Sequence, residues 1–560
     1  MKSEEIRKVI LETVAKNGGH LASSLGAVEI ALALSRVFEP EKDRIVWDVG
    51  HQAYAWKILT GRADDFASLR KIDGISGFPN PHESKADAAF AGHAGAAIST
   101  ALGFAAARDR KGTDEQVVAV IGDAAIANGM SFEALNNCAA ATKKLIVVLN
   151  DNDMSISKPA GSFAKFLGRL ITGVRYNRVK TAAEKAGHAL KLTFLRGIYH
   201  KIESRIKSLF LGNAFFEQFG LRYIGPIDGH DLKALEGAFS VAKNDKRSVL
   251  VHVVTKKGKG YEPAEKDPTK WHGVGPFSLS EELGVRNEEL RKDKSWSAVF
   301  GETICAAARE DERICALTAA MKDGTGLTGF AAEFPQRFFD VGIAEEHMVA
   351  FAAGLAAGGL KPVVAVYSTF LQRAVDQVMH DVCLAKLPVV FCVDRAGVVG
   401  ADGVTHQGVF DIAMLRCLPG ITICEPKDAE DFRSLFKEAL DRKGPTVIRY
   451  PRGSASWFAK AEKVAAAFPG SVAVHPRYLK PFDMSEVEKA RAEGKKIVTI
   501  ENGSLAGGFG EAIGADIRFG WPDEFIPHGS QAELEKRYGL DADSIITRLS
   551  QSPASYFILA

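Results

Sequence analysis

The chain contains little cysteine and almost no net charge, and each shortage excludes a class of protein. Seven cysteines among 560 residues are too few for a disulfide scaffold, and no two stand in a C-x-x-C pair, which favours a reducing compartment. Each lies in an apolar or mixed stretch, so we expect the cysteines to be small buried hydrophobic residues. With 71 lysines and arginines against 69 aspartates and glutamates, the net charge is +2, which excludes a global field that attracts nucleic acid or an anionic membrane. Any anionic ligand must therefore be held by a local site.

Long hydrophobic runs are also missing. The chain begins Met1-Lys2-Ser3-Glu4-Glu5, with acids close to the point where a signal peptide would have its apolar segment. The longest apolar run, residues 349–359, is interrupted by glycines and is too short to span a bilayer. We therefore expect a soluble, cytoplasmic protein with no membrane and no nucleic-acid partner.

The composition that remains is that of a globular α/β protein. Hydrophobic residues make up 46% and charged residues 25%, and the length predicts three or four domains at roughly 150 residues each. Short runs rich in Val and Ile alternate with helix-length segments, which is typical of parallel sheets flanked by helices. The predicted strands are residues 44–47, 117–121, 145–149, 249–254, 314–318, 338–341, 362–366, 389–393, 421–424, 446–449, 471–474 and 497–500.

Three domains account for this pattern. We expect a first domain over residues 1–290, a second over 291–453 and a smaller α/β domain over 454–560. The stretch 162–213 is basic and amphipathic, and it is interpreted either as an insertion or lid on the first domain or as a solvated helical arm. A charged stretch, 280–294, has the composition of a linker.

Two polar residues at strand ends indicate a cofactor site. The strand predicted over 117–121 is closely followed by Asp123, and the strand over 145–149 by Asn152. Ligands of open parallel sheets bind at the carboxyl ends of neighbouring strands, where these side chains would meet. A carboxylate, an amide oxygen and a carbonyl suit Mg²⁺, with Asp123, Asn152 and the backbone of Met154 as ligands. Either residue alone would be an N-cap or a turn residue, but the pair at this spacing favours the metal.

The same stretch resembles the diphosphate–magnesium motif of thiamine-diphosphate enzymes, which is usually Gly-Asp-Gly with an Asn about thirty residues further on. Here the third position is Ala124. We expect its methyl group either to crowd the diphosphate or to require a different backbone angle.

A second signature lies at a strand-to-helix junction over residues 338–347. It carries two adjacent acids, Glu345 and Glu346. In thiamine-diphosphate enzymes a carboxylic acid hydrogen-bonds the aminopyrimidine of the cofactor, and burial in an apolar pocket keeps such an acid protonated or proton-sharing. Either residue fits this role, and the other is then a solvated acid at a helix start.

Longer matches cover almost the whole chain. They resemble the 1-deoxy-D-xylulose-5-phosphate synthase family, and such ordered stretches are far more specific than a single glycine motif. The matching stretches are residues 19–23, 47–54, 57–62, 223–230, 256–268, 367–373, 394–397, 400–408 and 449–453.

The resemblance implies a transketolase-like thiamine-diphosphate-binding fold and a transferase activity. The family joins pyruvate to D-glyceraldehyde 3-phosphate with loss of CO₂, giving the first intermediate of the methylerythritol phosphate route to isoprenoids, with a link to thiamine biosynthesis. Thiamine diphosphate and Mg²⁺ are the implied cofactors, and a homodimer is the implied assembly. By the same analogy the active site lies between the first and second domains of one chain.

The resemblance also assigns roles by position. Glu345 is the activating acid, and Phe370 is the ring that stacks on the aminopyrimidine. Further cofactor contacts are His51, His93 and Lys257. The residues that line the reaction centre are His20, His51, His272, Asp402 and His406. The residues that grip the phosphate of the aldehyde are Ser23, Tyr367, Arg395 and Arg452.

Elementary chemistry agrees with these roles. A phosphate dianion calls for planar bidentate donors, which two arginines supply together with hydroxyl groups. Histidines of near-neutral pKa are natural donors and acceptors for the protons of a decarboxylation and an aldol-type addition. Four other histidines match no functional motif and are interpreted as structural: His188, His200, His252 and His380.

The chain departs from the family pattern at several positions. Besides Ala124, Ala94 and Gly95 stand where two serines are usual, and Glu346 replaces a glutamine. The lead before His20 is short and the third domain is abbreviated, so the resemblance is to a shortened, divergent member. Two alternatives stay open: another transketolase-type or oxo-acid-decarboxylase-type thiamine-diphosphate enzyme, and a catalytically weakened regulatory paralogue.

Overall fold

The computed structural model describes residues 1–152, 212–279, 294–453, 457–551 and 554–560. The chain forms two compact units, the first made of Met1–Leu69 and Gly77–Glu282 and the second of Arg70–Ser76 and Leu283–Ala560. Met154, nearly all of the predicted insertion at 162–213 and nearly all of the predicted linker at 280–294 lie outside the described residues.

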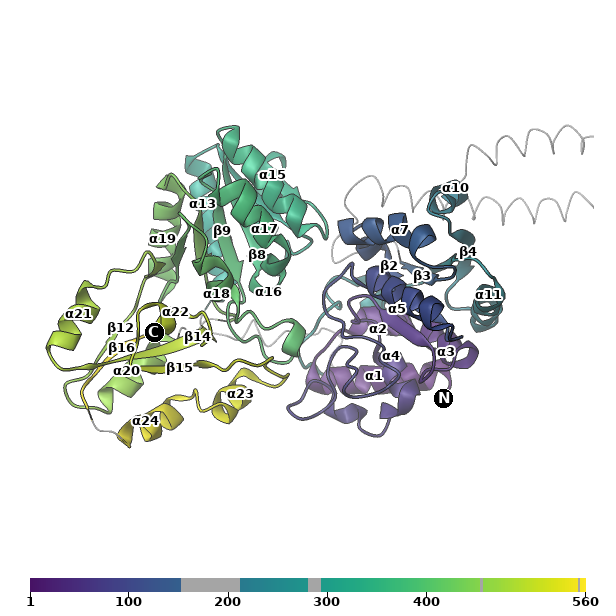
Figure 1. Ribbon diagram of the computed structural model, residues 1–560, viewed down its shortest axis with the longest axis horizontal. Helices are drawn as coiled ribbons and strands as arrows, with labels where there is room; N and C mark the ends of the chain where they lie inside the picture. Colours follow the sequence, from purple (N-terminus) through teal and green to yellow (C-terminus); the bar gives the residue numbers. More distant parts are fainter. Residues whose placement is uncertain (153–211, 280–293, 454–456, 552–553) are drawn as a thin grey trace, which may run out of the picture. The chain divides into compact units, whose positions relative to one another are not determined.

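The first unit is built on a five-stranded parallel sheet with the strand order β1-β2-β3-β5-β4. Its strands are β1 (Arg44–Trp47), β2 (Val117–Gly122), β3 (Ile146–Asp151), β4 (Arg222–Asp228) and β5 (Val249–Val254). The helices of this unit are α1 (Ser3–Asn17), α2 (Leu21–Gly26), α3 (Val28–Val37), α4 (Tyr54–Lys57), α5 (Ala97–Lys111), α6 (Asp123–Ile126), α7 (Gly129–Ala141), α10 (Gly212–Glu217), α11 (Leu232–Asn244) and α12 (Glu262–Lys266). All of them except α6 and α12 are labelled in Figure 1. Strands β2 and β3 are almost wholly buried, as their continuous Val and Ile runs require of a parallel sheet covered by helices.

The second unit contains a seven-stranded sheet with the order β13-β10-β11-β9-β8-β6-β7. All its strands are parallel except β13, which pairs antiparallel with β10. The strands are β6 (Ile314–Thr318), β7 (Phe338–Asp340), β8 (Lys361–Tyr367), β9 (Val390–Asp394), β10 (Thr422–Cys424), β11 (Thr446–Arg449) and β13 (Tyr478–Lys480). The longer helices around the sheet are α13 (Trp296–Glu310), α14 (Thr328–Glu333), α15 (Glu345–Ala357), α18 (Asp411–Arg416) and α19 (Ala429–Asp441), with the short α16 (Ser368–Leu371) and α17 (Val375–Gln377) near β8.

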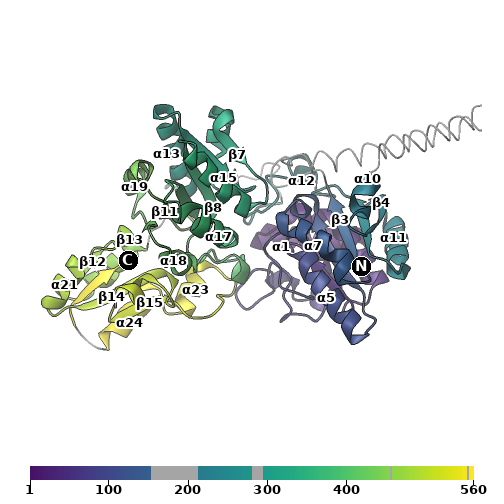
Figure 2. The ribbon, with the colours of Figure 1, turned by 45° about the horizontal axis from the view of Figure 1, so that its top comes forward.

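Two hydrophobic clusters cover the two faces of this sheet. Phe300 of α13 and Phe432 of α19 pack on one face, and Met348 of α15 and Leu415 of α18 pack on the other. The sheet is therefore sandwiched between helices, as predicted for parallel α/β layers, and the elements around it are visible in Figure 2.

A four-stranded parallel sheet, in the order β12-β16-β14-β15, completes the second unit. It consists of β12 (Val472–Val474), β14 (Lys496–Ser504), β15 (Ile517–Trp521) and β16 (Tyr556–Leu559). Its helices are α20 (Phe458–Ala466), α21 (Ser485–Ala492), α22 (Phe509–Ala512), α23 (Gln531–Arg537) and α24 (Ala542–Ser550). Ile497 and Phe557 pack into the cluster that also covers the seven-stranded sheet, while Val498 and Ile558 pack against α20 and α24.

The predicted α/β class and all twelve predicted strands are confirmed, with small shifts at their ends. Four strands were not predicted: β4, β13, β15 and β16. The division at residues 290 and 453 stays a prediction; β13, which follows position 453, belongs to the seven-stranded sheet.

The expectation that every cysteine is buried is wrong for Cys417. This residue directly follows the end of α18 and is exposed. Among the helices that the structure describes, none is both long enough and apolar enough to cross a membrane.

Candidate active site

Asp123 and Asn152 meet at the carboxyl edge of the first sheet. Strands β2 and β3 are parallel neighbours, with Gly122 in register with Asn150, so the residues that follow them lie side by side. The backbone N–H of Asn152 donates to Asp123 Oδ2 at 3.4 Å. Asn152 Oδ1 is buried and accepts no hydrogen bond from any described residue. A buried oxygen without a donor is costly in a protein interior, and a cation would satisfy it.

The charges around this pair also favour a cation. The pKa of Asp123 is raised to about 7, mainly by burial and then by the charge of the neighbouring Asp151, although hydrogen bonds from the backbone N–H groups of Ala124 and Asn152 and the charge of Lys257 oppose the rise. The pKa of Lys257 is lowered to about 8 by burial, against the opposing effect of Asp123. No group of three or more His, Cys, Asp and Glu side chains in the described part of the chain is placed to hold a metal. The described oxygens that meet here are the Asp123 carboxylate and the Asn152 amide oxygen, which suit a hard ion that shares its coordination with phosphate and water.

Three predicted histidines form a cluster in the first unit. The ring centroids of His20 and His51 lie 6.0 Å apart, those of His20 and His272 5.7 Å, and those of His51 and His272 5.3 Å. Ser23, predicted to bind phosphate, places its Oγ 3.3 Å from His272 Nδ1. The structure therefore brings these four residues together, although they come from segments far apart in the sequence.

Two of the three histidines have lowered pKa values. Burial lowers the pKa of His51 well below its usual value, and the charges of His20 and Lys257 lower it further. The pKa of His272 is lowered by burial and then by Lys257 and the two other histidines. His51 Nδ1 is buried with no hydrogen-bond partner among the described residues. Neutral imidazoles at this position can accept protons at physiological pH.

His93 lies in a loop that a buried carboxylate fixes at the start of α5. Asp48 accepts hydrogen bonds from the backbone N–H of Gly95, at 3.0 and 2.9 Å, and from that of Ala97 at 3.1 Å. Gly95 has φ +89°, and a Cβ there would lie 2.4 Å from Asn128 Oδ1, so the loop requires glycine at this position. Asp48 was not among the predicted site residues, although it lies within the matched stretch at 47–54.

Glu345 begins α15 and is the buried member of the acidic pair. Its residue is 3% exposed, whereas Glu346 is half-buried. Burial raises the pKa of Glu345, and Arg373, whose Nη1 lies 3.3 Å from Glu345 Oε2, opposes the rise. The activating role calls for a buried acid with a raised pKa, and Glu345 has both properties. The geometry therefore favours Glu345 over Glu346 for that role.

Aromatic rings and a guanidinium gather at the end of β8. Tyr367 and Phe370 stack with their centroids 5.8 Å apart, and the rings of Phe370 and His406 lie 5.7 Å apart edge to face. The Arg395 guanidinium lies 3.5 Å from the centroid of the Tyr367 ring, a cation–π contact. A Cβ on Gly324 would lie 1.7 Å from the Tyr367 hydroxyl, so glycine is needed there.

Asp402 lies between two arginines. Arg70 Nη1 is 2.7 Å from Asp402 Oδ1, and Arg452 Nη1 is 3.7 Å from Asp402 Oδ2. The Arg70 side chain is 10% exposed and that of Arg452 is 49% exposed. Arg70 was not predicted as a site residue, because no local pattern marks a partner 332 positions away.

The predicted residues thus fall into two sets, one in each unit. The first unit contains Asp123, Asn152, Lys257, His93, Ser23 and the three clustered histidines. The second contains Glu345, Phe370, Tyr367, Arg395, Asp402, His406 and Arg452. Ser23 therefore belongs to a different unit from the other three predicted phosphate ligands.

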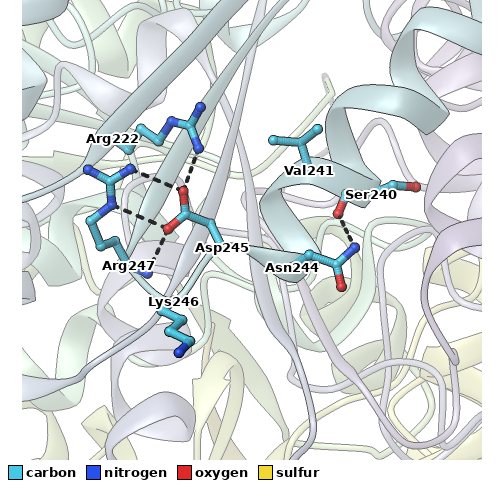
Figure 3. Close-up of a pocket in the computed structure, with 7 residues that line it drawn as sticks. All are labelled: Arg222, Ser240, Val241, Asn244, Asp245, Lys246 and Arg247. Atoms are coloured by element: carbon cyan, nitrogen blue, oxygen red, sulfur yellow. Dashed lines mark hydrogen bonds and ion pairs between the residues drawn. The ribbon is translucent and has the colours of Figure 1, made fainter.

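A surface hollow drawn in Figure 3 contains none of the predicted site residues. It lies where β4 begins and α11 ends, and Asp245 pairs there with Arg222 at 2.6 Å and with Arg247 at 3.3 Å. Both guanidinium groups are already paired with Asp245, and exposed ion pairs of this kind contribute little, so we assign this hollow no role.

Comparison with known proteins identifies the chain at the family level. A sequence profile described as 1-deoxy-D-xylulose-5-phosphate synthase matches residues 2–255, and profiles of the pyrimidine-binding and C-terminal domains of transketolase match residues 292–456 and 459–545. The chain is 46% identical to 1-deoxy-D-xylulose-5-phosphate synthase 1 of Geobacter metallireducens, over 97% of this chain and 95% of the relative. It is 43% identical to the synthase of Natranaerobius thermophilus, over 98% and 94%, and 46% identical to that of Desulforudis audaxviator, over 97% and 93%. None of these names supports the expected link to thiamine biosynthesis. Because these matches cover almost the whole chain at 43–46% identity, the chain belongs to the 1-deoxy-D-xylulose-5-phosphate synthase family.

Proposed function

We propose that this chain joins pyruvate to D-glyceraldehyde 3-phosphate with loss of CO₂, giving 1-deoxy-D-xylulose 5-phosphate, the reaction for which its family is named. It is a transketolase-type transferase that depends on thiamine diphosphate. The observation that carries the proposal is the pair Asp123 and Asn152, with its unsatisfied amide oxygen, in a chain 46% identical to a named synthase.

The carboxyl edge of the first sheet would hold Mg²⁺ and the diphosphate. Asp123 Oδ1 and Asn152 Oδ1 would bind the ion, together with the carbonyl of Met154. Lys257 is 6% exposed and its charge interacts with Asp123, so it would neutralise phosphate charge beside the metal, with His93 nearby. Thiamine diphosphate, when bound, supplies the thiazolium that stabilises a carbanion.

Glu345 would hold a proton against a ring nitrogen of the cofactor. Its burial at the start of α15 favours the protonated acid, and Arg373 keeps the proton exchangeable by favouring the carboxylate. Phe370, three residues after the end of β8, would present its ring face to the aminopyrimidine.

Neutral imidazoles would move protons during the reaction. His51 and His272 have lowered pKa values, so each can accept a proton at neutral pH and return it in a later step. His20, His406 and Asp402 complete the set that we assign to the reaction centre.

Arg395 and Arg452 would bind the phosphate of the aldehyde, with the hydroxyls of Tyr367 and Ser23. The Arg395 guanidinium stacks on Tyr367 and donates from Nη1 to the carbonyl of Gly324 at 3.3 Å, so its orientation is fixed. Its planar fork would then bind the phosphate through the N–H groups that these contacts do not use. The Arg452 side chain is 49% exposed and donates from Nη1 to the carbonyl of Val399 at 3.3 Å, so a ligand can approach it from the solvent side.

We also propose a cytoplasmic homodimer, on the family resemblance alone. Gel filtration with light scattering measures the assembly directly: a mass near twice 60.3 kDa supports the proposal, and a monomer contradicts it.

Calorimetric titration with thiamine diphosphate in the presence of Mg²⁺ tests the cofactor site. We expect saturable binding by the wild type and at least roughly tenfold weaker binding by Asp123→Asn, because a metal-binding carboxylate is lost. Asp245→Asn is the matched control, since it removes a surface carboxylate of the same unit, outside the proposed site. Equal binding by all three proteins would contradict the assignment.

A further inference from the structure

Asn502, near the end of β14, is hydrogen-bonded to the loop that carries Arg395. Asn502 is 5% exposed, and its Nδ2 donates to the carbonyl of Ala396 at 3.3 Å. Its Oδ1 accepts from the backbone N–H of Val398 at 3.3 Å and from Trp521 Nε1 at 3.2 Å. Both the nitrogen and the oxygen of the side-chain amide are therefore hydrogen-bonded to the backbone that directly follows Arg395.

Gly397 lies between the two hydrogen-bonded residues and permits this close approach. It has φ +79°, and a Cβ added to it would lie 2.0 Å from both Cγ and Nδ2 of Asn502. Gly397 also exchanges two backbone hydrogen bonds with Gly408, at 2.8 and 2.7 Å. The amide of Asn502 is thus packed flat against a backbone that only glycine can provide.

Arg395 itself has φ +59°, a conformation that is uncommon for a residue with a side chain. Such conformations persist only where the surroundings hold them, and they occur preferentially at functional sites. The residues after Arg395 are held by Asn502, and the N–H of Ala396 donates to the carbonyl of Tyr450 at 3.0 Å. These contacts constrain the backbone that sets the direction of the Arg395 guanidinium.

The other end of the loop is tied to the same C-terminal segment. Gln407 Oε1 accepts from the N–H of Val399 at 2.7 Å and from that of Gly400 at 3.3 Å. Its Nε2 donates to the carbonyl of Pro527 at 3.1 Å. Asp402 lies in the loop between these two hydrogen-bonded ends. One end is bonded to Asn502 and the other, through Gln407, to Pro527.

We propose that Asn502 is a positioning residue for the aldehyde-phosphate site, through which the C-terminal sheet sets the placement of Arg395. The inference rests on the proposed function, which puts Arg395 on the phosphate. Asn502 touches no substrate; it acts by holding residues 396–398 in the conformation that Arg395 needs. Misplacing a binding group by about 1 Å can cost up to roughly a hundredfold in rate, so the effect is measurable.

Steady-state kinetics of Asn502→Ala test this role. We expect the KM for D-glyceraldehyde 3-phosphate to rise roughly tenfold, with the KM for pyruvate within about twofold of wild type. The matched control is Glu501→Gln. Glu501, the neighbouring buried residue of β14, accepts hydrogen bonds from the N–H groups of Phe509 and Gly510 at 2.7 and 3.0 Å. Its loss weakens the same sheet without touching residues 396–398, so neither KM is expected to change.

Three further variants keep the test decisive. Asn502→Ser replaces Asn502→Ala if the latter fails to fold, and Gly397→Ala, which forces a Cβ against Asn502, is expected to produce the same selective rise. Equal changes in both KM values, or the same change in Glu501→Gln, would overturn the inference in favour of a purely structural role.

Arg395→Lys separates the positioning role from the proposed function. If this variant leaves the KM for the aldehyde unchanged, the assignment of Arg395 to the phosphate fails. If it raises that KM and the Asn502 variants do not, the positioning role of Asn502 fails.

Discussion

Arg373 Nη1 lies 3.3 Å from Glu345 Oε2, so the buried acid at the start of α15 has a cation beside it. Both side chains are at most 10% exposed. Burial favours the neutral acid and Arg373 favours the carboxylate, and burial is the larger effect on the pKa of Glu345. An acid under opposing influences of this kind can share a proton with a ring nitrogen rather than keep it or lose it outright.

Glu345→Gln is expected to reduce turnover by roughly a hundredfold or more, because general acid–base steps typically contribute that much. The affinity for Mg²⁺ and thiamine diphosphate should change little, since the proposed metal and diphosphate ligands belong to the first unit. Glu346→Gln is the control, and it should keep most of the activity because Glu346 is only half-buried. If Glu346→Gln loses turnover and Glu345→Gln does not, the assignment of the two acids is reversed.

The raised pKa of Glu345 also predicts a dependence of stability on pH. Its folded-state pKa lies above the usual 4.5, so its contribution to the free energy of unfolding is fully present below pH 4.5 and is lost as the pH rises through the raised value. The difference in unfolding free energy between the wild type and Glu345→Gln should therefore fall as the pH rises, by at most about 1.4 kcal/mol per pH unit. Urea unfolding of both proteins at several pH values measures this difference. A difference that is constant or rises with pH would show that the pKa is not raised.

The lowered pKa values of His51 and His272 predict that both rings stay neutral at physiological pH. In NMR spectra of histidine-labelled protein, we expect their ring signals not to titrate between pH 6 and 8. His51→Gln and His272→Gln assign the signals, and the exposed His380, paired with Asp381, serves as an internal reference because its pKa is raised. A midpoint at or above pH 6.5 for either ring would contradict the predicted neutral state.

Arg452→Ala is expected to raise the KM for D-glyceraldehyde 3-phosphate by roughly tenfold or more, since a hydrogen bond to a charged group contributes about 1.5–3 kcal/mol. The KM for pyruvate should change far less, because pyruvate carries no phosphate. Arg309→Ala should leave both values unchanged, because Arg309 is an exposed residue of α13 that pairs only with Glu333 of α14 among the ion pairs of the described chain. Equal effects of Arg452→Ala on both substrates would argue against a phosphate-binding role.

The backbone of Ala124 does not require glycine. Ala124 lies inside α6 and is not one of the residues with a positive φ, so an alanine fits this position without strain. We expect Ala124→Gly to change the affinity for thiamine diphosphate by less than about twofold and to destabilise the fold by about 0.5–1 kcal/mol. Calorimetry and thermal unfolding measure the two effects. Markedly tighter cofactor binding would mean that the methyl group does crowd the diphosphate.

The Asp123–Asn152 pair could be predicted from the sequence because its geometry follows from one rule. Consecutive strands of a parallel sheet end at the same edge, so residues that follow two neighbouring strands must lie close together. The strands themselves were recognisable as continuous Val and Ile runs. By contrast, β13 and β15 are short or mixed in polarity, with sequences Tyr-Leu-Lys and Ile-Arg-Phe-Gly-Trp, and were missed.

The rest of the site depends on contacts that local sequence does not encode. Glu345 and Glu346 are adjacent, and only the rotation of α15 against its core decides which one is buried. Arg70 reaches Asp402 across 332 positions, and Asn502 reaches Ala396 across 106. No spacing rule relates such pairs, because they are set by how the sheets and loops of the second unit pack.

The release of CO₂ from pyruvate, measured with and without D-glyceraldehyde 3-phosphate, tests the central claim most directly. With thiamine diphosphate and Mg²⁺ present, we expect rapid CO₂ release only when both substrates are supplied, with one equivalent of 1-deoxy-D-xylulose 5-phosphate formed per CO₂. Rapid release from pyruvate alone would indicate a different decarboxylase, and no release under either condition would indicate a non-catalytic paralogue; either result would contradict the proposed synthase.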